Sequence, residues 1–339
     1  MLRKTLSTTL IFLLASTLFF VSCAKKEVPV KDKTFVELNG SLQIKGTQLM
    51  NQFGDSVVLH GVSFGWHCFH PKFYNDSCVT FLVKDWRANV LRAAMGVDPD
   101  WGYRKDPFGS VKLISKVVDA AIRNGVYVII DFHSHKIHTK EALKFFTEMA
   151  TKYGKSPNVI YEIFNEPDDQ CSWPDVKAYS EQVVAAIRAI DPDNLILVGC
   201  PHWDQDIQLV AADPLKNQTN LMYTMHFYAG THKQWLRDRT DSAIAQGIPI
   251  FISECAGMDA TGDGPIDYTE WPAYLNWMDK NKLSWCTWSL SDKAETCSML
   301  VNGSSATGSW PEEAIKEWGM ITRTALQSRN NAPLTDNPK

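Results

Sequence analysis

Several patterns that would assign a function at once are missing from this chain of 339 residues. It has no C-x-x-C motif, which argues against a structural zinc site, and no G-x-G-x-x-G motif, which argues against an open dinucleotide-binding sheet. The net charge is only −4 and no basic stripe is present, so we expect no nucleic-acid partner. Repeats and low-complexity tracts are also lacking. What remains is a chain with 45% hydrophobic residues, enough for one sizeable core.

A run of apolar residues long enough to span a bilayer is absent as well, but a shorter one opens the chain. Two basic residues precede an apolar segment at residues 9–20, which is typical of an export signal. The small residues before Cys23 resemble the lipobox of bacterial lipoproteins; an ordinary signal peptide with an incidental cysteine is the alternative. We therefore expect a lipoprotein signal peptide at residues 1–22. Lipidation of Cys23 would anchor the protein in a membrane of the bacterial cell envelope, at the cell surface or in the periplasm, unless it is secreted.

The remaining chain divides into three parts by composition. Residues 23–37 are polar and charged and contain two prolines, which predicts a flexible tether. Residues 38–330 are expected to form one catalytic domain, and residues 331–339 a disordered tail. We expect the protein to act as a monomer.

Seven cysteines follow Cys23, and an odd number cannot all pair within one chain. Cys68 and Cys78 are close enough in sequence to form a loop disulfide. Three others lie in or beside apolar segments and are expected to be small buried side chains: Cys200, Cys255 and Cys286.

Apolar strand-like segments alternate with helical periodicity over most of the domain. A hairpin is expected between residues 41 and 59, around a turn at 51–55. Eight strand candidates follow, at residues 57–62, 88–94, 126–132, 159–164, 194–198, 221–227, 248–253 and 283–289. Helical spacing of apolar residues is clearest at 111–123, 141–153, 176–190, 271–281 and 311–327. Such alternation implies parallel strands and predicts an α/β fold, a (β/α)₈ TIM barrel with a short N-terminal β-hairpin. A doubly wound open sheet is the alternative.

Two of these strands end in glutamate. Residues 159–164 are apolar and run into Asn165, Glu166 and Pro167, and Pro167 must end the strand because it has no N–H. The strand at 248–253 runs directly into Glu254. A carboxylate at the end of a buried strand is costly unless it lines a cleft. In a barrel, active sites lie at the C-terminal ends of the strands, so the two glutamates are expected to work as a pair.

Other strand ends bring further polar and aromatic side chains to the same face of the barrel. They are Arg92, His133, His202, Trp203, His226, Tyr228 and Trp288. Two carboxylates over an aromatic floor suit the hydrolysis of a glycoside, in which one acid protonates the leaving oxygen and the other attacks the anomeric carbon. We expect Arg92 to keep Glu254 ionised and mutual repulsion to raise the pKa of Glu166. The sequence does not fix the carboxyl separation, which distinguishes retention from inversion.

Four short motifs resemble glycoside hydrolase family 5: Asn165-Glu166-Pro167, Asp131-Phe132-His133, His226-Phe227-Tyr228 and Ser253-Glu254. Three longer ones are similar to the bacterial endo-β-1,4-glucanases (cellulases) of its subfamily 2: residues 92–95, 203–206 and 288–295. The resemblance extends over nearly all of the chain beyond about residue 38. It implies a retaining endo-β-1,4-glucanase that cuts cellulose or related β-glucans by double displacement, without a cofactor or a metal.

The resemblance also implies a role for each matching residue. Glu254 would be the nucleophile and Glu166 the acid/base. Asn165 would hold the 2-hydroxyl of the sugar in subsite −1, Arg92 and His226 would orient the surroundings of the nucleophile, and Tyr228 would hydrogen-bond Glu254. The remaining substrate-binding residues would be His133 and Trp288 in subsite −1, Trp203 on the plus side, and Lys293 and Glu295 on the minus side.

The chain departs from the family pattern at several positions. Cys255 and Ala256 follow the nucleophile where the family often has Trp-Gly. Gly96 replaces a frequent aromatic residue, whose space Trp101 or Tyr103 is expected to fill. Phe69 falls where a minus-side tryptophan is common. These differences concern distal subsites rather than the chemistry.

Three other functions compete with this interpretation. Another family activity, on mannan, xyloglucan or mixed-linkage β-glucan, would use the same carboxylates with different loops. His133-Ser134-His135 is an H-x-H pattern at a strand end, as in metal-dependent barrel hydrolases. A surface lipoprotein that binds glycans without cutting them is the third, although both glutamates are present.

Overall fold

A computed structural model describes residues 33–330 of the chain. The expected signal peptide at 1–22, Cys23, most of the tether and the tail at 331–339 lie outside the described residues. None of the described helices is long and apolar enough to cross a membrane.

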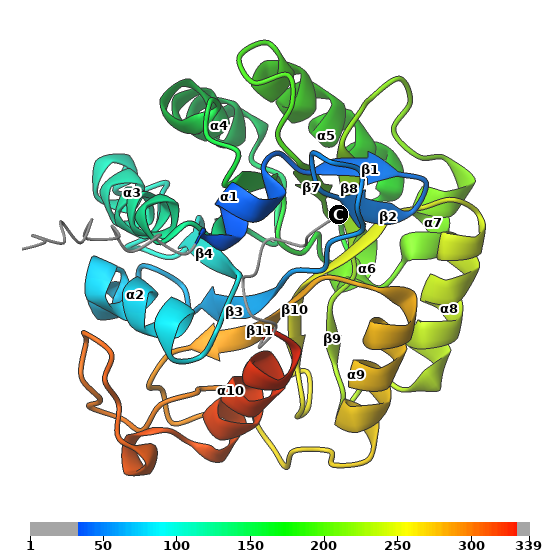
Figure 1. Cartoon of the computed structure of the whole chain (residues 1–339). Helices are drawn as coiled ribbons and strands as arrows, with labels where there is room; N and C mark the ends of the chain where they lie inside the picture. The colour runs from blue at the N-terminus through cyan, green and yellow to red at the C-terminus, as the bar shows by residue number, and fades with distance from the viewer. Residues whose placement is uncertain (1–32, 331–339) are drawn as a thin grey trace, which may run out of the picture. The chain divides into compact units, whose positions relative to one another are not determined.

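The predicted (β/α)₈ barrel is confirmed (Figure 1). Parallel strands follow one another around the barrel in the order β3-β4-β5-β6-β7-β8-β10-β11, and β11 pairs with β3 to close it. The strands are β3 (His60–Phe64), β4 (Val90–Gly96), β5 (Tyr127–His133), β6 (Val159–Glu162), β7 (Ile196–Val198), β8 (Leu221–Thr224), β9 (Phe227–Tyr228), β10 (Ile250–Ala256) and β11 (Trp285–Leu290). The expected sixth strand is divided, because β8 and β9 pair with successive parts of β10.

Helices surround the barrel. The helices of the described chain are α1 (Phe35–Asn39), α2 (Asp76–Lys84), α3 (Pro107–Asn124), α4 (Thr139–Tyr153), α5 (Trp173–Arg188), α6 (Pro201–Asp204), α7 (Ile207–Ala212), α8 (Gln234–Ala245), α9 (Glu270–Asn281) and α10 (Glu317–Arg329), with short 3₁₀ turns η1 (Pro71–Phe73) and η2 (Glu312–Ala314). α3 shows why they form: the Asp106 side chain accepts from Gly109 N, Pro107 opens the helix, and Gly125 ends it at a φ of 66°.

Two apolar clusters form the core of the barrel and its helices. The larger one lies between the strands and the helices and includes Val117, Phe145 and Val183. The smaller one fills one end of the barrel interior, with Ile129 and Leu197 among its members. Because both faces of each strand are covered, the strands are mostly apolar, and their polar residues lie mainly toward the C-terminal ends.

An antiparallel hairpin closes the N-terminal end of the barrel. It consists of β1 (Gln43–Lys45) and β2 (Gln48–Met50). The expected hairpin is therefore present, but its turn lies at residues 46–47, where Gly46 adopts a φ of 62°, and not at 51–55. Residues 51–55 form a second turn, whose N–H groups at Phe53 and Asp55 donate to the Asn51 side chain.

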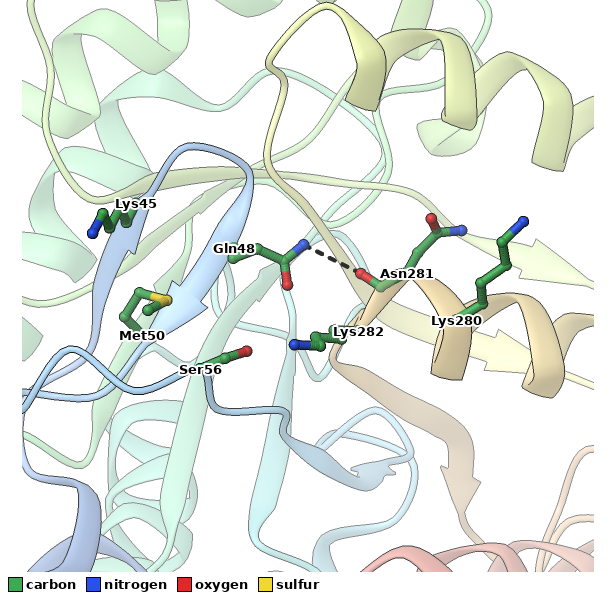
Figure 2. A pocket seen from close by; sticks show the side chains of 7 residues that line it. All are labelled: Lys45, Gln48, Met50, Ser56, Lys280, Asn281 and Lys282. Carbon is green, nitrogen blue, oxygen red and sulfur yellow. Dashed lines mark hydrogen bonds between the residues drawn. The ribbon is translucent and has the colours of Figure 1, made fainter. Parts of the chain in front are cut away.

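A cavity of about 580 Å³ lies beside this hairpin, and Figure 2 shows the seven residues that line it. Gln48 Nε2 donates to the backbone oxygen of Asn281 across it, which ties β2 to the end of α9. The hairpin also contacts residues at the start of strands, since Ile44 N donates to Asn220 just before β8. The cavity thus belongs to the N-terminal end of the barrel, opposite the ends at which Glu166 and Glu254 lie.

Two expectations about the chain are wrong. The tether was expected to extend to residue 37, but α1 begins at Phe35, because Thr34 and Glu37 form a capping box and Val36 is buried in the smaller cluster. Cys68 and Cys78 do not form a disulfide; all seven cysteines of the described chain are free. Cys200, Cys255 and Cys286 are buried, as predicted.

Candidate active site

Two glutamates meet at the C-terminal ends of the barrel strands. Glu166 follows β6 and Glu254 lies in β10. The Glu166 N–H donates to Ser134 O at 3.2 Å, so the segment after β6 stays alongside the end of β5. One carboxylate oxygen of each glutamate and one ring nitrogen of His226 lie within 4.8 Å of one another. The structure therefore brings together the two acids that the sequence singles out.

Arg92 lies at the centre of the charged groups beneath this pair. Its side chain on β4 is fully buried, and its guanidinium nitrogens lie 2.9 Å from Asp131, 2.7 Å from Glu162 and 3.0 Å from Glu254. Nη2 also donates to Asn165 Oδ1 at 2.6 Å. Burial disfavours the charged guanidinium, but the three carboxylates outweigh it and raise the pKa of Arg92 well above its usual value. Arg92 therefore stays charged and orients four side chains at once.

Glu254 is held at both of its oxygens. Oε2 accepts from Arg92, and Oε1 accepts from the Tyr228 hydroxyl at 2.7 Å. Burial and the nearby Glu254 raise the pKa of Tyr228 well above 10, so the phenol keeps its proton and acts as the donor. This leaves the carboxylate of Glu254 with a fixed position and direction.

Glu166 has a different main partner. His226 Nδ1 lies 2.9 Å from Glu166 Oε1, while His226 Nε2 lies 2.8 Å from Ser253 Oγ and 3.4 Å from Asp204. Burial disfavours a charged imidazole, but Asp204, Glu162 and Glu166 outweigh it and raise the pKa of His226 well above 6.5. His226 is therefore an imidazolium that donates to Glu166.

The pKa values of the two glutamates differ in the sense opposite to the one expected. Burial favours the neutral form of both. For Glu166, the hydrogen bond and charge of His226 outweigh burial and hold the pKa below its usual value. For Glu254, burial and the neighbouring Glu166 outweigh Arg92 and raise the pKa. The sequence could not place a charged His226 beside Glu166, so it predicted the reverse order.

Three side chains around the pair have the geometry of a sugar site. Asn165 Oδ1 is bonded to Arg92, but its buried Nδ2 has no partner among the described residues and can donate to a hydroxyl. The rings of His133 and Trp288 stack at 5.2 Å and 10°, and Trp288 remains half-buried, with a cis peptide bond to Ser289. Asp131 fixes the His133 ring through Nδ1 at 2.7 Å. Together they offer a donor and a flat apolar surface beside the carboxylates.

The other predicted residues lie farther along the same face. Trp203 is half-buried in α6, at a φ of 53°, and its backbone N–H donates to Pro167 O at 2.9 Å, which joins α6 to the segment that carries Glu166. Lys293 and Glu295 form an ion pair with each other in the loop after β11. The space at Gly96 is filled by neither Trp101 nor Tyr103. Tyr103 is buried in the core, and Trp66 packs against Gly96 so closely that a Cβ there would lie 2.8 Å from its ring.

Three functional side chains were not assigned a role from the sequence. Glu162 binds Arg92, Ser253 Oγ donates to Glu162 at 2.6 Å, and Asp204 faces His226. A signal for Glu162 was present, because a charged residue within an otherwise apolar strand needs a buried partner. Asp204 gave no such signal, since its burial depends on three consecutive residues with positive φ, His202 to Asp204.

The H-x-H pattern does not form a joint metal site in the described structure. His133 Nδ1 faces Asp131, whereas His135 Nδ1 lies 3.6 Å from Glu166. Glu166, His226 and Glu254 are close enough to hold an ion, but His226 and Arg92 are both positively charged there and would repel a cation. The residues present therefore fit a metal poorly.

Comparisons with known proteins agree with this geometry. The sequence profile of the family described as Cellulase (glycosyl hydrolase family 5) matches residues 50–294. Endoglucanase Z of Dickeya dadantii is 42% identical and aligns with 84% of this chain, and an endoglucanase of Clostridium saccharobutylicum is 36% identical and aligns with 99%. The chain spans 66% and 75% of the length of these two relatives. The catalytic domain of Thermobifida fusca endoglucanase Cel5A, solved with cellotetraose, is 32% identical with a TM-score of 0.82, covering 87% of this chain and 100% of that one.

Proposed function

This chain belongs to glycosyl hydrolase family 5, and we propose that it is a retaining endo-β-1,4-glucanase acting on cellulose or related β-glucans. The observation that supports the mechanism most directly is the approach of Glu166 and Glu254 to within 4.8 Å. Retaining enzymes keep their carboxyl groups roughly 5–5.5 Å apart, whereas inverting enzymes need roughly 6.5–9.5 Å to admit a water between acid and sugar. The short separation of Glu166 and Glu254 supports the retaining mechanism, in which one carboxylate attacks the sugar itself.

We assign the nucleophile to Glu254 and the acid/base to Glu166. Arg92 and Tyr228 fix both oxygens of Glu254, as attack along one direction requires. Glu166 is followed by Pro167, whose backbone oxygen accepts from the Trp203 N–H, and the leaving sugar would stack on Trp203. The first step needs Glu166 in its protonated form and Glu254 in its ionised form. Once Glu254 is esterified, its charge no longer opposes ionisation of Glu166, which then acts as base toward water.

The residues around the pair then bind the polysaccharide. Asn165 Nδ2 would donate to the 2-hydroxyl of the −1 sugar, a contact that strengthens in the transition state. His133 and Trp288 would face this sugar, and Trp203 would bind on the plus side. Lys293 and Glu295 would hydrogen-bond minus-side sugars.

Rescue of alanine variants by azide distinguishes the two roles. With 2,4-dinitrophenyl β-cellobioside, whose leaving group needs no proton, Glu254→Ala plus azide should give the α-glycosyl azide, because azide enters from the face of the missing carboxylate. Glu166→Ala plus azide should give the β-glycosyl azide, because the covalent intermediate still forms. On cellulose, Glu166→Ala should lose about 10²–10⁴-fold in turnover. The control is Glu181→Ala, because the Glu181 side chain is exposed on α5. The opposite stereochemical results would exchange the assignments.

The substrate and the rival functions are tested together. Release of reducing ends should be measured on carboxymethylcellulose, mannan, xyloglucan and mixed-linkage glucan, with and without EDTA. Cleavage that EDTA abolishes would support the metal enzyme, and binding without cleavage would support the glycan carrier. Fastest cleavage of carboxymethylcellulose, unchanged by EDTA, is the result we expect.

We also propose that Cys23 is lipidated, so that a monomeric enzyme is anchored in the bacterial cell envelope. The support is the sequence pattern of residues 1–23. Radiolabelled palmitate should be incorporated by the full chain and not by Cys23→Ser, while Cys68→Ser serves as the matched control. Equal labelling of the wild type and Cys23→Ser would contradict the proposal.

A further inference from the structure

The end of the barrel opposite the two glutamates presents basic side chains that have no acidic partner. Lys45 lies in β1, Lys280 and Lys282 lie at the end of α9, and all three line the cavity beside the hairpin (Figure 2). Each of them is exposed, and none forms an ion pair within residues 33–330. Because like charges repel one another when no counter-charge is present, such a cluster is typical of a surface that binds an anionic partner.

The acids on the neighbouring elements do not neutralise these lysines. Asp279 in α9 is paired with Arg329 at 2.6 Å, and Asp241 in α8 accepts from Trp277 Nε1 at 2.8 Å. Asp55 is exposed in the turn beside the cavity. Even when Asp55 and Asp241 are both counted against the three lysines, the surface keeps a net positive charge.

An apolar side chain stands in water beside the lysines. Phe53 is 65% exposed in the turn that joins Met50 and Ser56, which both line the cavity. The turn is held in place, because the Asn51 side chain accepts from the N–H groups of Phe53 and Asp55. An exposed aromatic ring next to lysines is the composition of a membrane-surface site, in which the ring enters the headgroup region while the lysines meet anionic lipids.

The chain also enters the barrel at this end. The described residues begin at Lys33, and the Val36 N–H donates to Gly125 O shortly before β5 begins. α1 therefore lies over the same end of the barrel as the hairpin (Figure 1). Nine residues separate Lys33 from Cys23. A chain of this length spans at most about 35 Å, so a lipid on Cys23 would keep this end of the barrel close to the membrane.

We propose that Lys45, Lys280, Lys282 and Phe53 form a docking surface for a membrane of anionic phospholipids. The ammonium groups bind the phosphodiester groups of the lipids, and the Phe53 ring enters the boundary between headgroups and acyl chains. This inference rests on the anchoring through Cys23 proposed above, although the surface itself needs no acyl chain in order to bind. Docking at this end directs the catalytic end of the barrel away from the membrane and toward the polysaccharide.

The first test measures vesicle binding without the acyl chain. Residues 24–339 keep the closed barrel and both of its apolar clusters. This chain should sediment with vesicles of phosphatidylglycerol and phosphatidylcholine and not with phosphatidylcholine alone, and added salt should weaken the binding. Each of Lys45→Gln, Lys280→Gln and Lys282→Gln should weaken it about 5-fold, and the triple variant about 100-fold. Phe53→Ala should weaken it as well.

Two matched controls lie at the catalytic end. Lys105 and Phe108 are exposed beside the start of α3, so Lys105→Gln and Phe108→Ala should leave vesicle binding unchanged. Since residues 25–33 add four lysines to every one of these chains, the variants are compared with one another at constant salt. Cleavage of a soluble cellooligosaccharide should stay unchanged in all of them, which shows that they are folded.

The second test locates the surface in the full chain, reconstituted in phosphatidylglycerol vesicles. Acetylation of Lys45, Lys280 and Lys282 by a water-soluble reagent should be slower in vesicles than in detergent, while Lys105 reacts equally in both. Protection of Lys105 instead would overturn the proposal, because the catalytic end would then face the membrane.

Equal sedimentation of the triple variant and the parent chain would also overturn the docking surface, and would leave a protein partner or a second copy of this chain as its occupant. Failure of the proposed anchoring is a separate result. If Cys23 carries no lipid, sedimentation of residues 24–339 still decides the docking surface, because that chain lacks Cys23. Loss of binding in the triple variant would support the surface, and unchanged binding would reject it.

Discussion

Removing the charge of His226 should change both the rate and its pH dependence. The substitution His226→Gln keeps a polar side chain but removes an imidazolium that faces Glu166 at 2.9 Å. A hydrogen bond between charged groups contributes about 1.5–3 kcal/mol. We therefore expect kcat/KM at the wild-type optimum to fall about 10- to 150-fold.

The pH profile should move in a defined direction. His226 lowers the pKa of both Glu166 and Glu254, so its loss raises both. A general acid works while protonated, and a raised pKa of Glu166 extends activity to higher pH. A nucleophile works while ionised, and a raised pKa of Glu254 removes activity at low pH. Both limbs of the kcat/KM profile should shift upward, because the two limbs report the coupled pair and the loss of His226 raises the pKa of both glutamates.

His232→Gln is the matched control. His232 is also buried and its Nδ1 accepts from the Tyr228 N–H at 2.8 Å, but burial lowers the pKa of its ring to about 4, so it is neutral at the assay pH. This variant removes no charge and should leave both limbs in place. The measurement is kcat/KM on a soluble cellooligosaccharide at pH values above the pKa of His232, from about pH 5 upward, with circular dichroism to confirm folding. A folded His226→Gln variant with unmoved limbs would refute the assignment of a charged His226.

Three further substitutions test the network around the pair. Arg92→Met leaves buried carboxylates without their cation and should lower the free energy of unfolding by about 3–5 kcal/mol. Urea titrations measure this loss, which should be smaller for Arg92→Lys. Equal stability of Arg92→Met and the wild type would contradict the expected loss. Arg92 and His226 outweigh burial and lower the pKa of Glu162 to about 2, so its stabilising effect is complete above about pH 4.5 and is lost as pH falls to about 2. The difference in the free energy of unfolding between the wild type and Glu162→Gln should therefore decrease as the pH falls through this range. A constant difference would show that Glu162 is not ionised in the folded protein. Gly96→Ala should displace Trp66 and raise KM on cellooligosaccharides. When it is combined with Glu166→Ala, azide rescue should be the same as for Glu166→Ala alone. An unchanged KM in Gly96→Ala would show that the position of Trp66 does not depend on Gly96.

Much of the fold follows from the sequence because strands with two buried faces are apolar along their whole length. The eight segments were found on that basis, and each strand lies within about three residues of its expected position. The helices α2 and α8 and the short helices α1, α6 and α7 were not identified, and α10 begins at Glu317 instead of residue 311. α8 contains five charged or amide side chains and is only partly covered, so its apolar periodicity is weak. The hairpin turn was misplaced because Asn51 and Gly54 also form a turn, and local turn signals do not reveal which one reverses the strand.

The candidate site was predictable to the level of its residues but not of its charges. Each strand end placed a side chain at the catalytic face, so Glu166, Glu254 and Arg92 could be named from the chain alone. Their pKa order could not, because it depends on His226, which lies between β8 and β9, 60 residues after Glu166, and reaches it only because the barrel is closed. The same holds for Asp204, which reaches His226 through an unusual left-handed stretch of backbone.

The charged groups around the two glutamates influence which of them carries a proton. Two cations, Arg92 and His226, share the buried centre with five carboxyl groups: Asp131, Glu162, Glu166, Asp204 and Glu254. Charged neighbours lower the pKa of Glu162 and Glu166, and burial raises the pKa of the other three. The reactive form is the one in which Glu166 carries a proton and Glu254 does not. A glycosidic oxygen that accepts a hydrogen bond from protonated Glu166 favours this form, so substrate binding itself prepares Glu254 to attack.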